Sequence, residues 1–126
     1  MRLRQLLGLQ PFTPETFFLE LWVRPQEMFR PAPDNETNDT TSGLHLPSDV
    51  TASYRKWFNQ TRAIQYNGCK KTLFNQYGYP WTHLGYTYDW SPDSKTNMGL
   101  LEFVIKENTT MYISGKYSNI DYCSFK

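Results

Sequence analysis

The feature that most constrains this sequence is an aromatic run from Tyr77 to Trp90, which reads YGYPWTHLGYTYDW. It sets four tyrosines and two tryptophans among two glycines, one proline, a histidine and an aspartate. Tyr and Trp combine a large flat apolar body with a polar tip. A dense run of them therefore builds either a corner of the core or a wall on which a planar ligand stacks. The histidine and the aspartate favour the wall.

The length and the charge balance restrict the class of protein. A chain of 126 residues predicts a single domain, residues 1–126, because domains commonly contain about 100 to 150 residues. Thirteen Lys and Arg against twelve Asp and Glu leave a formal charge of +1. No long-range field therefore recruits polyanions or an anionic bilayer, and nucleic acid would bind through a local patch only.

The sequence gives little indication of targeting and contains only two cysteines. The first ten residues are basic and apolar, but Gly8 breaks the apolar stretch before Pro11, so we expect no export signal. No stretch approaches the ~20 apolar residues of a spanning helix. We expect a soluble protein without a membrane partner, either cytoplasmic or delivered by a secretion system. Cys69 and Cys123 allow at most one disulfide.

The first half of the chain predicts one strand, one long loop and one helix. Residues 17–24 alternate as a strand does, although a helix starting at Thr13 also fits, and we favour the strand. Residues 25–29 then suit one helical turn. Residues 30–47 hold prolines and short polar side chains and predict a long surface loop. From Ser48 to about Arg62 we expect an amphipathic helix capped by Ser48; its apolar stripe is Val50, Tyr54, Trp57 and Phe58.

The second half predicts mostly strands. Residues 91–97 are rich in turn formers, residues 98–105 read as a strand, and residues 110–114 as a second strand that could pair with it as a hairpin. Alternation sets Glu102 on a face with Leu100 and Val104. The expected fold is α+β: a small, mainly antiparallel sheet with one amphipathic helix and long surface loops.

The sequence contains no motif for a metal site or for a phosphate-binding loop. The two histidines and two cysteines lack the paired spacings of zinc ligands, and no glycine-rich phosphate loop occurs. We therefore predict no metal. A Cys69–His83 nucleophile pair is conceivable, but a buried cysteine beside an unrelated histidine explains the same residues.

A family resemblance rests on the order of three features. Arg24 ends the first strand, an aromatic and hydroxyl segment follows, and Glu102 precedes the apolar residues Phe-Val-Ile. This order resembles the layout of ADP-ribosyltransferase toxin domains, and the aromatic segment is similar to small bacterial polymorphic or effector toxins. The usual Ser-Thr-Ser step is replaced by Thr82 or Thr87. Leu100, two positions before Glu102, stands where many members of that family carry Gln or Glu. In place of transfer to an arginine acceptor, this leaves NAD glycohydrolysis, another acceptor or no activity open.

The resemblance implies NAD as substrate and gives each residue a role. Glu102 would stabilise the oxocarbenium-like state formed when the nicotinamide–ribose bond breaks. The guanidinium of Arg24 would grip the phosphates. The pocket wall would comprise Thr82, Tyr86, Thr87, Tyr88 and Trp90. A protein or nucleic acid would accept the ADP-ribose, and a neutralising immunity protein would exist.

Two other hypotheses stay open. In a metal-independent ribonuclease, His83 would be the general base and Glu102 its acid or orienting partner; the phosphate contacts would be Arg55, Lys56 and Arg62. In a non-enzymatic binding module, the aromatic wall would meet a protein or a sugar, since Tyr and Trp are enriched at interface hot spots. Each residue also has a structural explanation: a surface ion pair for Arg24, core packing for the rings and a solvated strand position for Glu102.

Overall fold

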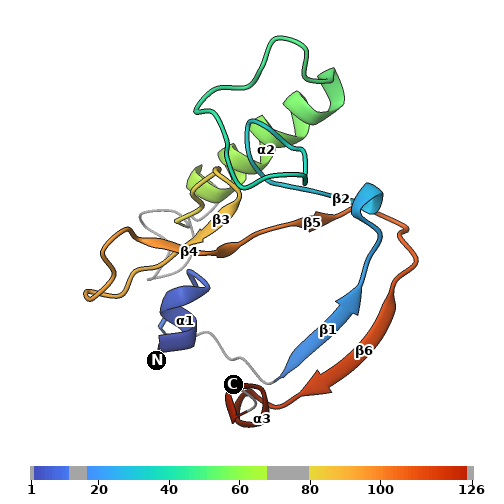
Figure 1. The fold of residues 1–126 in the computed structure, drawn as a ribbon. Helices are drawn as coiled ribbons and strands as arrows, with labels where there is room; N and C mark the ends of the chain where they lie inside the picture. The colour runs from blue at the N-terminus through green and yellow to red at the C-terminus, as the bar shows by residue number, and fades with distance from the viewer. Residues whose placement is uncertain (1, 12–16, 68–79, 125–126) are drawn as a thin grey trace.

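The computed structural model describes residues 2–11, 17–67 and 80–124 (Figure 1). The prediction of a small α+β fold is confirmed, since the described residues form helices and short antiparallel strands. The described elements follow the chain in this order: α1 (Arg2–Leu6), β1 (Phe18–Trp22), the 3-10 turn η1 (Pro25–Glu27), β2 (Met28–Phe29), α2 (Ala52–Asn67), β3 (Tyr86–Tyr88), β4 (Met98–Leu101), β5 (Val104–Ile105), β6 (Tyr112–Tyr117) and α3 (Asn119–Ser124).

The described strands form three separate antiparallel pairs rather than one sheet: β1 with β6, β2 with β5, and β3 with β4. The strand predicted over residues 17–24 is confirmed as β1 with the shorter bounds Phe18–Trp22. The helical turn predicted at residues 25–29 is confirmed only for Pro25–Glu27, as η1, because Met28 and Phe29 form strand β2. Figure 1 shows the β2–β5 pair crossing the middle of the molecule, with α2 on one side and the β1–β6 pair on the other.

The predicted hairpin between residues 98–105 and 110–114 is wrong. The first of these segments breaks at Glu102 and Phe103 into β4 and β5, and β6 pairs with β1 instead. The backbone N–H of Lys106 donates to the Glu27 carbonyl at 2.9 Å, which extends the β2–β5 ladder past Ile105. The chain after β4 thus continues antiparallel to residues 18–29, an arrangement that local alternation does not specify.

The first ten residues contain a docked helix. Helix α1 ends in a Schellman motif: Gly8 has φ +68°, its N–H donates to the Gln5 carbonyl, and the Leu9 N–H donates to the Arg4 carbonyl. The Thr87 hydroxyl donates to the Leu6 carbonyl at 2.6 Å. Helix α1 is thereby fixed beside the β3–β4 pair.

The predicted amphipathic helix is confirmed, with shifted bounds. Helix α2 runs from Ala52 to Asn67, so it begins four positions after Ser48, where we expected it to begin. Thr51 is the cap, since its hydroxyl accepts the Tyr54 N–H at 3.3 Å and its carbonyl accepts the Arg55 N–H at 3.0 Å. The predicted apolar stripe faces the core cluster: Tyr54, Phe58 and Trp81 are buried, and Phe29, Leu46, Val50 and Trp57 pack around them.

The segment 30–47 carries no helix or strand, but the prediction that it lies at the surface is wrong for its first part. Arg30, Pro31, Ala32 and Pro33 are buried. The Arg30 guanidinium donates to the Thr41 carbonyl at 2.7 Å and to the Leu84 carbonyl at 3.4 Å. Carbonyl oxygens accept from both terminal nitrogens of the buried guanidinium and the Asp39 carboxylate lies 3.5 Å from one of them, whereas its Nε has no hydrogen-bond partner among the described residues. These contacts tie the loop to the aromatic segment.

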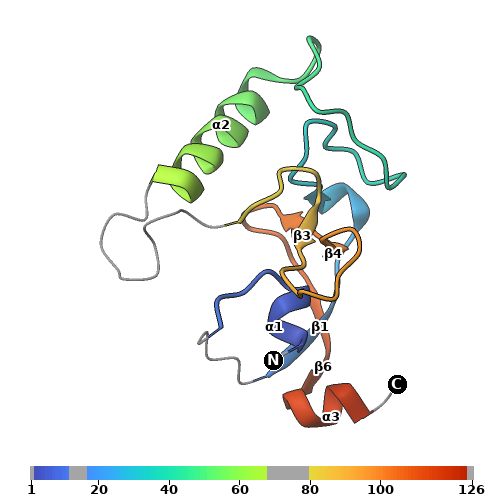
Figure 2. The same ribbon diagram turned by 90° about the vertical axis from the view of Figure 1, so that its left-hand side faces the viewer.

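Figure 2 shows the molecule from a second side. Helix α2 projects from one end, and the β1–β6 pair extends to the opposite end, where α3 lies. Among the described elements, β1 packs chiefly on β6, and β6 packs on β1 and α3. The end with β1 and β6 is therefore more open than the end with the core cluster.

Candidate functional site

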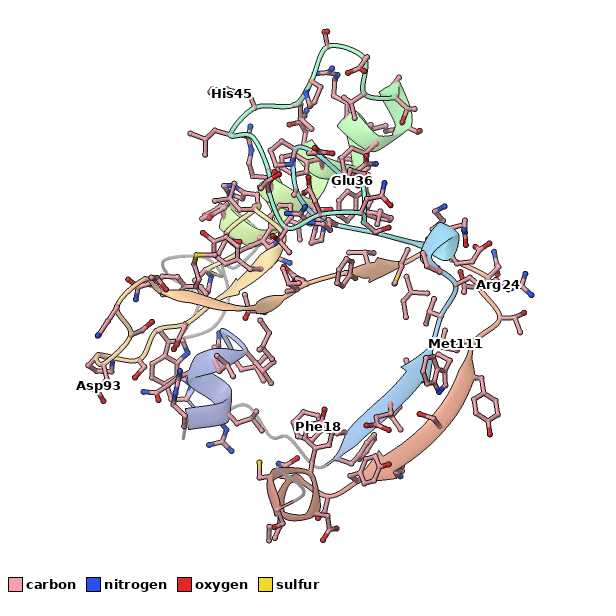
Figure 3. All side chains as sticks on the ribbon, in the orientation of Figure 1. Phe18, Arg24, Glu36, His45, Asp93 and Met111 are labelled. Atoms are coloured by element: carbon pink, nitrogen blue, oxygen red, sulfur yellow. The ribbon has the colours of Figure 1, made fainter. Side chains whose placement is uncertain are left out.

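The residues predicted as an essential pair lie in different parts of the molecule. Arg24 is exposed between β1 and η1, and Figure 3 shows it pointing outward at that corner. Glu102 follows β4, at the other end of the β2–β5 pair (Figure 1). The structure does not bring the guanidinium and the carboxylate to a common hollow.

Glu102 does meet much of the predicted wall. Its backbone N–H donates to the Gly85 carbonyl at 2.9 Å, one step beyond the β3–β4 ladder. Its side chain lines a small cavity of about 30 Å³. The other lining residues come from the turn after α1 and from the aromatic segment: Leu7, Gly8, Pro80, Trp81, Thr82, Tyr86, Thr87 and Tyr88.

The electrostatics of this hollow disfavour a charged carboxylate. Burial raises the pKa of Glu102, and a hydrogen bond with the Trp81 side chain opposes that shift. The Oε2 atom is buried and has no hydrogen-bond partner in the described part of the chain. A space of about 30 Å³ holds about one water molecule, whereas a nicotinamide ring is several times larger.

Three of the predicted binding residues make structural hydrogen bonds. The Thr82 hydroxyl bonds the Tyr86 carbonyl and accepts the Leu84 N–H, which closes the turn before β3. The Thr87 hydroxyl accepts the Leu100 N–H at 2.9 Å besides bonding α1. The Trp90 indole N–H donates to the Leu9 carbonyl at 2.9 Å. These contacts position α1 and β3.

His83 lies on the core side of Trp81. Its ring contacts the rings of Phe58, Tyr66 and Trp81, with centroids 6.3, 5.6 and 5.1 Å away. Burial lowers the pKa of His83, and the positive charge of Arg62 lowers it further. Its Nε2 is buried without a partner among the described residues. A neutral imidazole boxed by aromatic rings is a packing residue in this arrangement.

The basic residues assigned to the ribonuclease hypothesis lie along α2. The Arg55 guanidinium donates to the Pro47 carbonyl at 2.8 Å, and Lys56 and Arg62 are exposed. Arg62 is near enough to His83 to influence its pKa. Cys69 of the alternative nucleophile pair and Tyr77 of the aromatic run lie outside the described residues.

A larger groove, which the sequence did not indicate, lies between α2 and the β2–β5 pair. It has a volume of about 690 Å³. Apolar side chains form much of it: Met28, Phe29, Trp57, Val104 and Ile105. The polar contributors are Asn35, Thr51, Ser53, Lys106 and Glu107, with Tyr54 at the inner wall. A second hollow of about 440 Å³ shares Asn35 and Thr51 with it.

The aromatic walls of this groove are held rigidly. Phe29 meets Trp57 edge to face at 4.8 Å, and Tyr54 stacks on Trp57 at 5.5 Å. The Lys106 ammonium donates to the Gln26 carbonyl, which restrains its side chain. The stripe of Tyr54 and Trp57 was visible in the sequence, but the strands opposite it were not predicted to pair, so the groove had no sequence signal.

Over residues 2–11, 17–67 and 80–124, no three His, Cys, Asp or Glu side chains are grouped closely enough to hold a metal ion. In that same part of the chain, no helix combines the length and apolarity needed to cross a bilayer.

Comparisons with protein-family models, curated proteins and solved structures gave no match.

Proposed function

We propose that this chain is a non-enzymatic binding module that holds a polypeptide in the groove between α2 and the β2–β5 pair. The observation that carries the proposal is the groove itself: about 690 Å³ lies within the roughly 300 to 1,000 Å³ typical of ligand sites. Its lining combines apolar and aromatic side chains with a comparable number of polar residues, which can orient a bound ligand.

The contrast with the predicted catalytic hollow supports binding over turnover. The cavity at Glu102 has a volume of about 30 Å³, and Arg24 does not line it. Thr82, Thr87 and Trp90 are engaged in internal hydrogen bonds. NAD cleavage stays a prediction of the sequence, with Glu102 as its central residue.

Two features favour a polypeptide as the ligand. First, the groove adjoins a second hollow along Asn35 and Thr51, so the two suit an extended chain better than one compact molecule. Second, each described sheet has two strands, so every strand keeps one edge without a strand partner. A polypeptide can add a strand to such an edge through its regularly spaced N–H and C=O groups, a pattern that a sugar does not have.

A blocking variant tests the groove. Ser53 is exposed on the first turn of α2 and lines the groove. Ser53→Trp should fill the groove without removing a core side chain. Asn59→Trp is the matched control, because Asn59 is exposed on the same helix and does not line the groove.

The wild-type protein would be used to select binders from a displayed library of linear peptides. Its binding to immobilised oligosaccharides would be measured in parallel. We expect peptides with apolar anchors to be enriched, and their affinity to fall at least about tenfold, or 1.4 kcal/mol, in Ser53→Trp. Asn59→Trp should bind as the wild type does. An absence of enriched peptides, equal binding by Ser53→Trp, or binding of sugars alone would overturn the proposal.

A further inference from the structure

The second hollow beside the α2 groove is acidic. It has a volume of about 440 Å³, and its lining includes the side chains of Asp34 and Asp49. None of the described residues that line it is Lys, Arg or His. Because Asn35 and Thr51 line both spaces, the acidic hollow adjoins the apolar surface of the groove. A ligand that extends along both spaces meets an apolar surface and two carboxylates.

The two carboxylates have no cationic partner within the chain. Neither Asp34 nor Asp49 forms an ion pair with a described residue. One oxygen of Asp34 accepts the Glu36 N–H at 3.4 Å. The Arg55 guanidinium donates to the carbonyl of Pro47, another lining residue, at 2.8 Å and not to either carboxylate. A concave surface that carries two unpaired charges of one sign attracts a ligand of the opposite sign.

The cation that suits this hollow is a side chain rather than a metal ion. Over the described residues, neither carboxylate belongs to a group of three His, Cys, Asp or Glu side chains that could hold a metal ion. An ammonium or a guanidinium needs no such cage, because it bonds well to one or two carboxylates. A hollow of about 440 Å³ is also within the size range of ligand sites.

We infer that the polypeptide held in the α2 groove carries a Lys or Arg side chain that lies in the acidic hollow, where Asp34 and Asp49 select it. This inference rests on the function proposed above and adds the charge of the ligand to it. The charged residues of the groove itself, Lys106 and Glu107, have opposite signs. The two aspartates therefore decide the net charge that the ligand meets.

A double-mutant cycle tests this preference for a basic ligand. The protein variant combines Asp34→Asn with Asp49→Asn, which removes both charges and nearly keeps the side-chain shapes. The amide oxygen introduced at position 34 can still accept the Glu36 N–H. Asp93→Asn is the matched control, since Asp93 is exposed and lines neither space (Figure 3). The ligand is a peptide enriched on the wild-type protein, with its basic residue either kept or replaced by norleucine.

The measurement is the affinity of both peptides for the three full-length proteins by titration calorimetry, with circular dichroism to verify folding. The double variant should bind the basic peptide at least about fivefold more weakly than the wild type at low ionic strength. This loss should shrink as salt is added. The norleucine peptide should bind the double variant and the wild type equally, because it has no charge to couple with the aspartates. Asp93→Asn should bind each peptide as the wild type does.

Two kinds of failure are distinguishable. Enriched peptides that Ser53→Trp no longer binds, but that contain no excess of Lys or Arg over the unselected library, would overturn this inference and leave the proposed function standing. Equal binding of the basic peptide by the double variant, or an equal loss for the norleucine peptide, would do the same. If no peptide were enriched, both the proposed function and this inference would fall.

Discussion

Asp89 accepts two hydrogen bonds from the guanidinium of Arg2, from Nη1 to Oδ1 at 2.7 Å and from Nη2 to Oδ2 at 2.8 Å. The two residues are 87 positions apart, and Asp89 is buried while Arg2 is largely exposed. Asp89 also accepts the Ser91 N–H at 3.1 Å. One carboxylate thus fixes both α1 and the loop after β3.

This ion pair should make stability fall in acid. The hydrogen bond with Arg2 lowers the pKa of Asp89. The folded state therefore binds its proton less readily than the unfolded state, whose value is near 3.9. The stabilisation is complete above that value and is lost as the pH falls through the lowered pKa. Urea unfolding from neutral to acidic pH should show a shallower decline in Asp89→Asn, which should also be less stable at neutral pH. An equal decline in both proteins would contradict this account.

Gly99 should be required for the docking of α1. A Cβ at this position would collide with the Thr87 hydroxyl and with the backbone carbonyl of Leu6. Because a backbone atom cannot move aside cheaply, we expect Gly99→Ala to cost about 1 to 3 kcal/mol of unfolding free energy in urea titrations. Gly43→Ala is the control, since its nearest neighbour would be 3.9 Å away. Equal stability of the two variants would argue against the docked position of α1.

Tyr54 should stabilise the buried start of the 30–47 segment. Its hydroxyl lies 2.9 Å from the Arg30 carbonyl and 2.7 Å from the Ala32 carbonyl, so one proton serves two buried acceptors. Burial raises the pKa of Tyr54 to about 12. Tyr54→Phe leaves these carbonyls without that donor and should cost about 1 to 3 kcal/mol in urea unfolding.

Tyr112→Phe is the matched control for that experiment, since Tyr112 is 69% exposed. Surface substitutions of this kind usually change stability by less than about 0.5 kcal/mol. If Tyr54→Phe were equally neutral, the burial of residues 30–33 would need another cause.

Glu102→Gln separates a structural role from a catalytic one. Burial raises the pKa of Glu102 above its ordinary 4.5. The folded state then holds its proton more tightly than the unfolded state, so stability falls as pH rises from 4.5 to the raised pKa. The variant should lose this pH dependence and should be at least as stable as the wild type at neutral pH.

The same variant tests NAD cleavage. If the chain releases nicotinamide from NAD, with or without cell lysate, Glu102→Gln should abolish release while the fold is kept. Absence of nicotinamide release by folded wild-type protein in both conditions would remove the transferase and glycohydrolase hypotheses. Equal release by the variant would remove Glu102 from the chemistry.

His83 should protonate at a lower pH than a solvated histidine does. Burial and the charge of Arg62 lower its pKa. The unfolded state, with a value near 6.5, then takes up its proton first, so stability falls as pH drops from 6.5 to the lowered pKa. Proton NMR titration would follow both imidazoles, with His45→Gln to assign them. A pKa for His83 at or above 6.5 would contradict the aromatic box around its ring.

The elements that sequence patterns predicted are those set by local periodicity. The stripe of Tyr54 and Trp57 specified α2, and alternation specified β1, because each depends on residues a few positions apart. The helix is capped by Thr51 and not by the expected Ser48, because the periodicity of apolar residues does not distinguish between two hydroxyl residues so close together. The 30–47 segment was expected at the surface because its composition is polar, yet Arg30 is buried through carbonyl groups distant in sequence.

The residues of the candidate sites could be predicted only where the contacts between them are local in sequence. Glu102, Tyr86 and Tyr88 do line one hollow, since β3 pairs with β4 close by in sequence. Arg24 lies elsewhere because β1 pairs with β6, a long-range choice that no local pattern encodes. The α2 groove likewise requires β2 to meet β5 across most of the chain.

The pairing of β1 with β6 has a consequence for biosynthesis. On a ribosome, residues 18–22 emerge long before residues 112–117, so strand β1 has no strand partner until β6 has been translated. Such non-local closure slows folding and leaves an apolar segment exposed meanwhile. Nascent chains stalled before β6 should therefore be chaperone clients, whereas chains released after it should not.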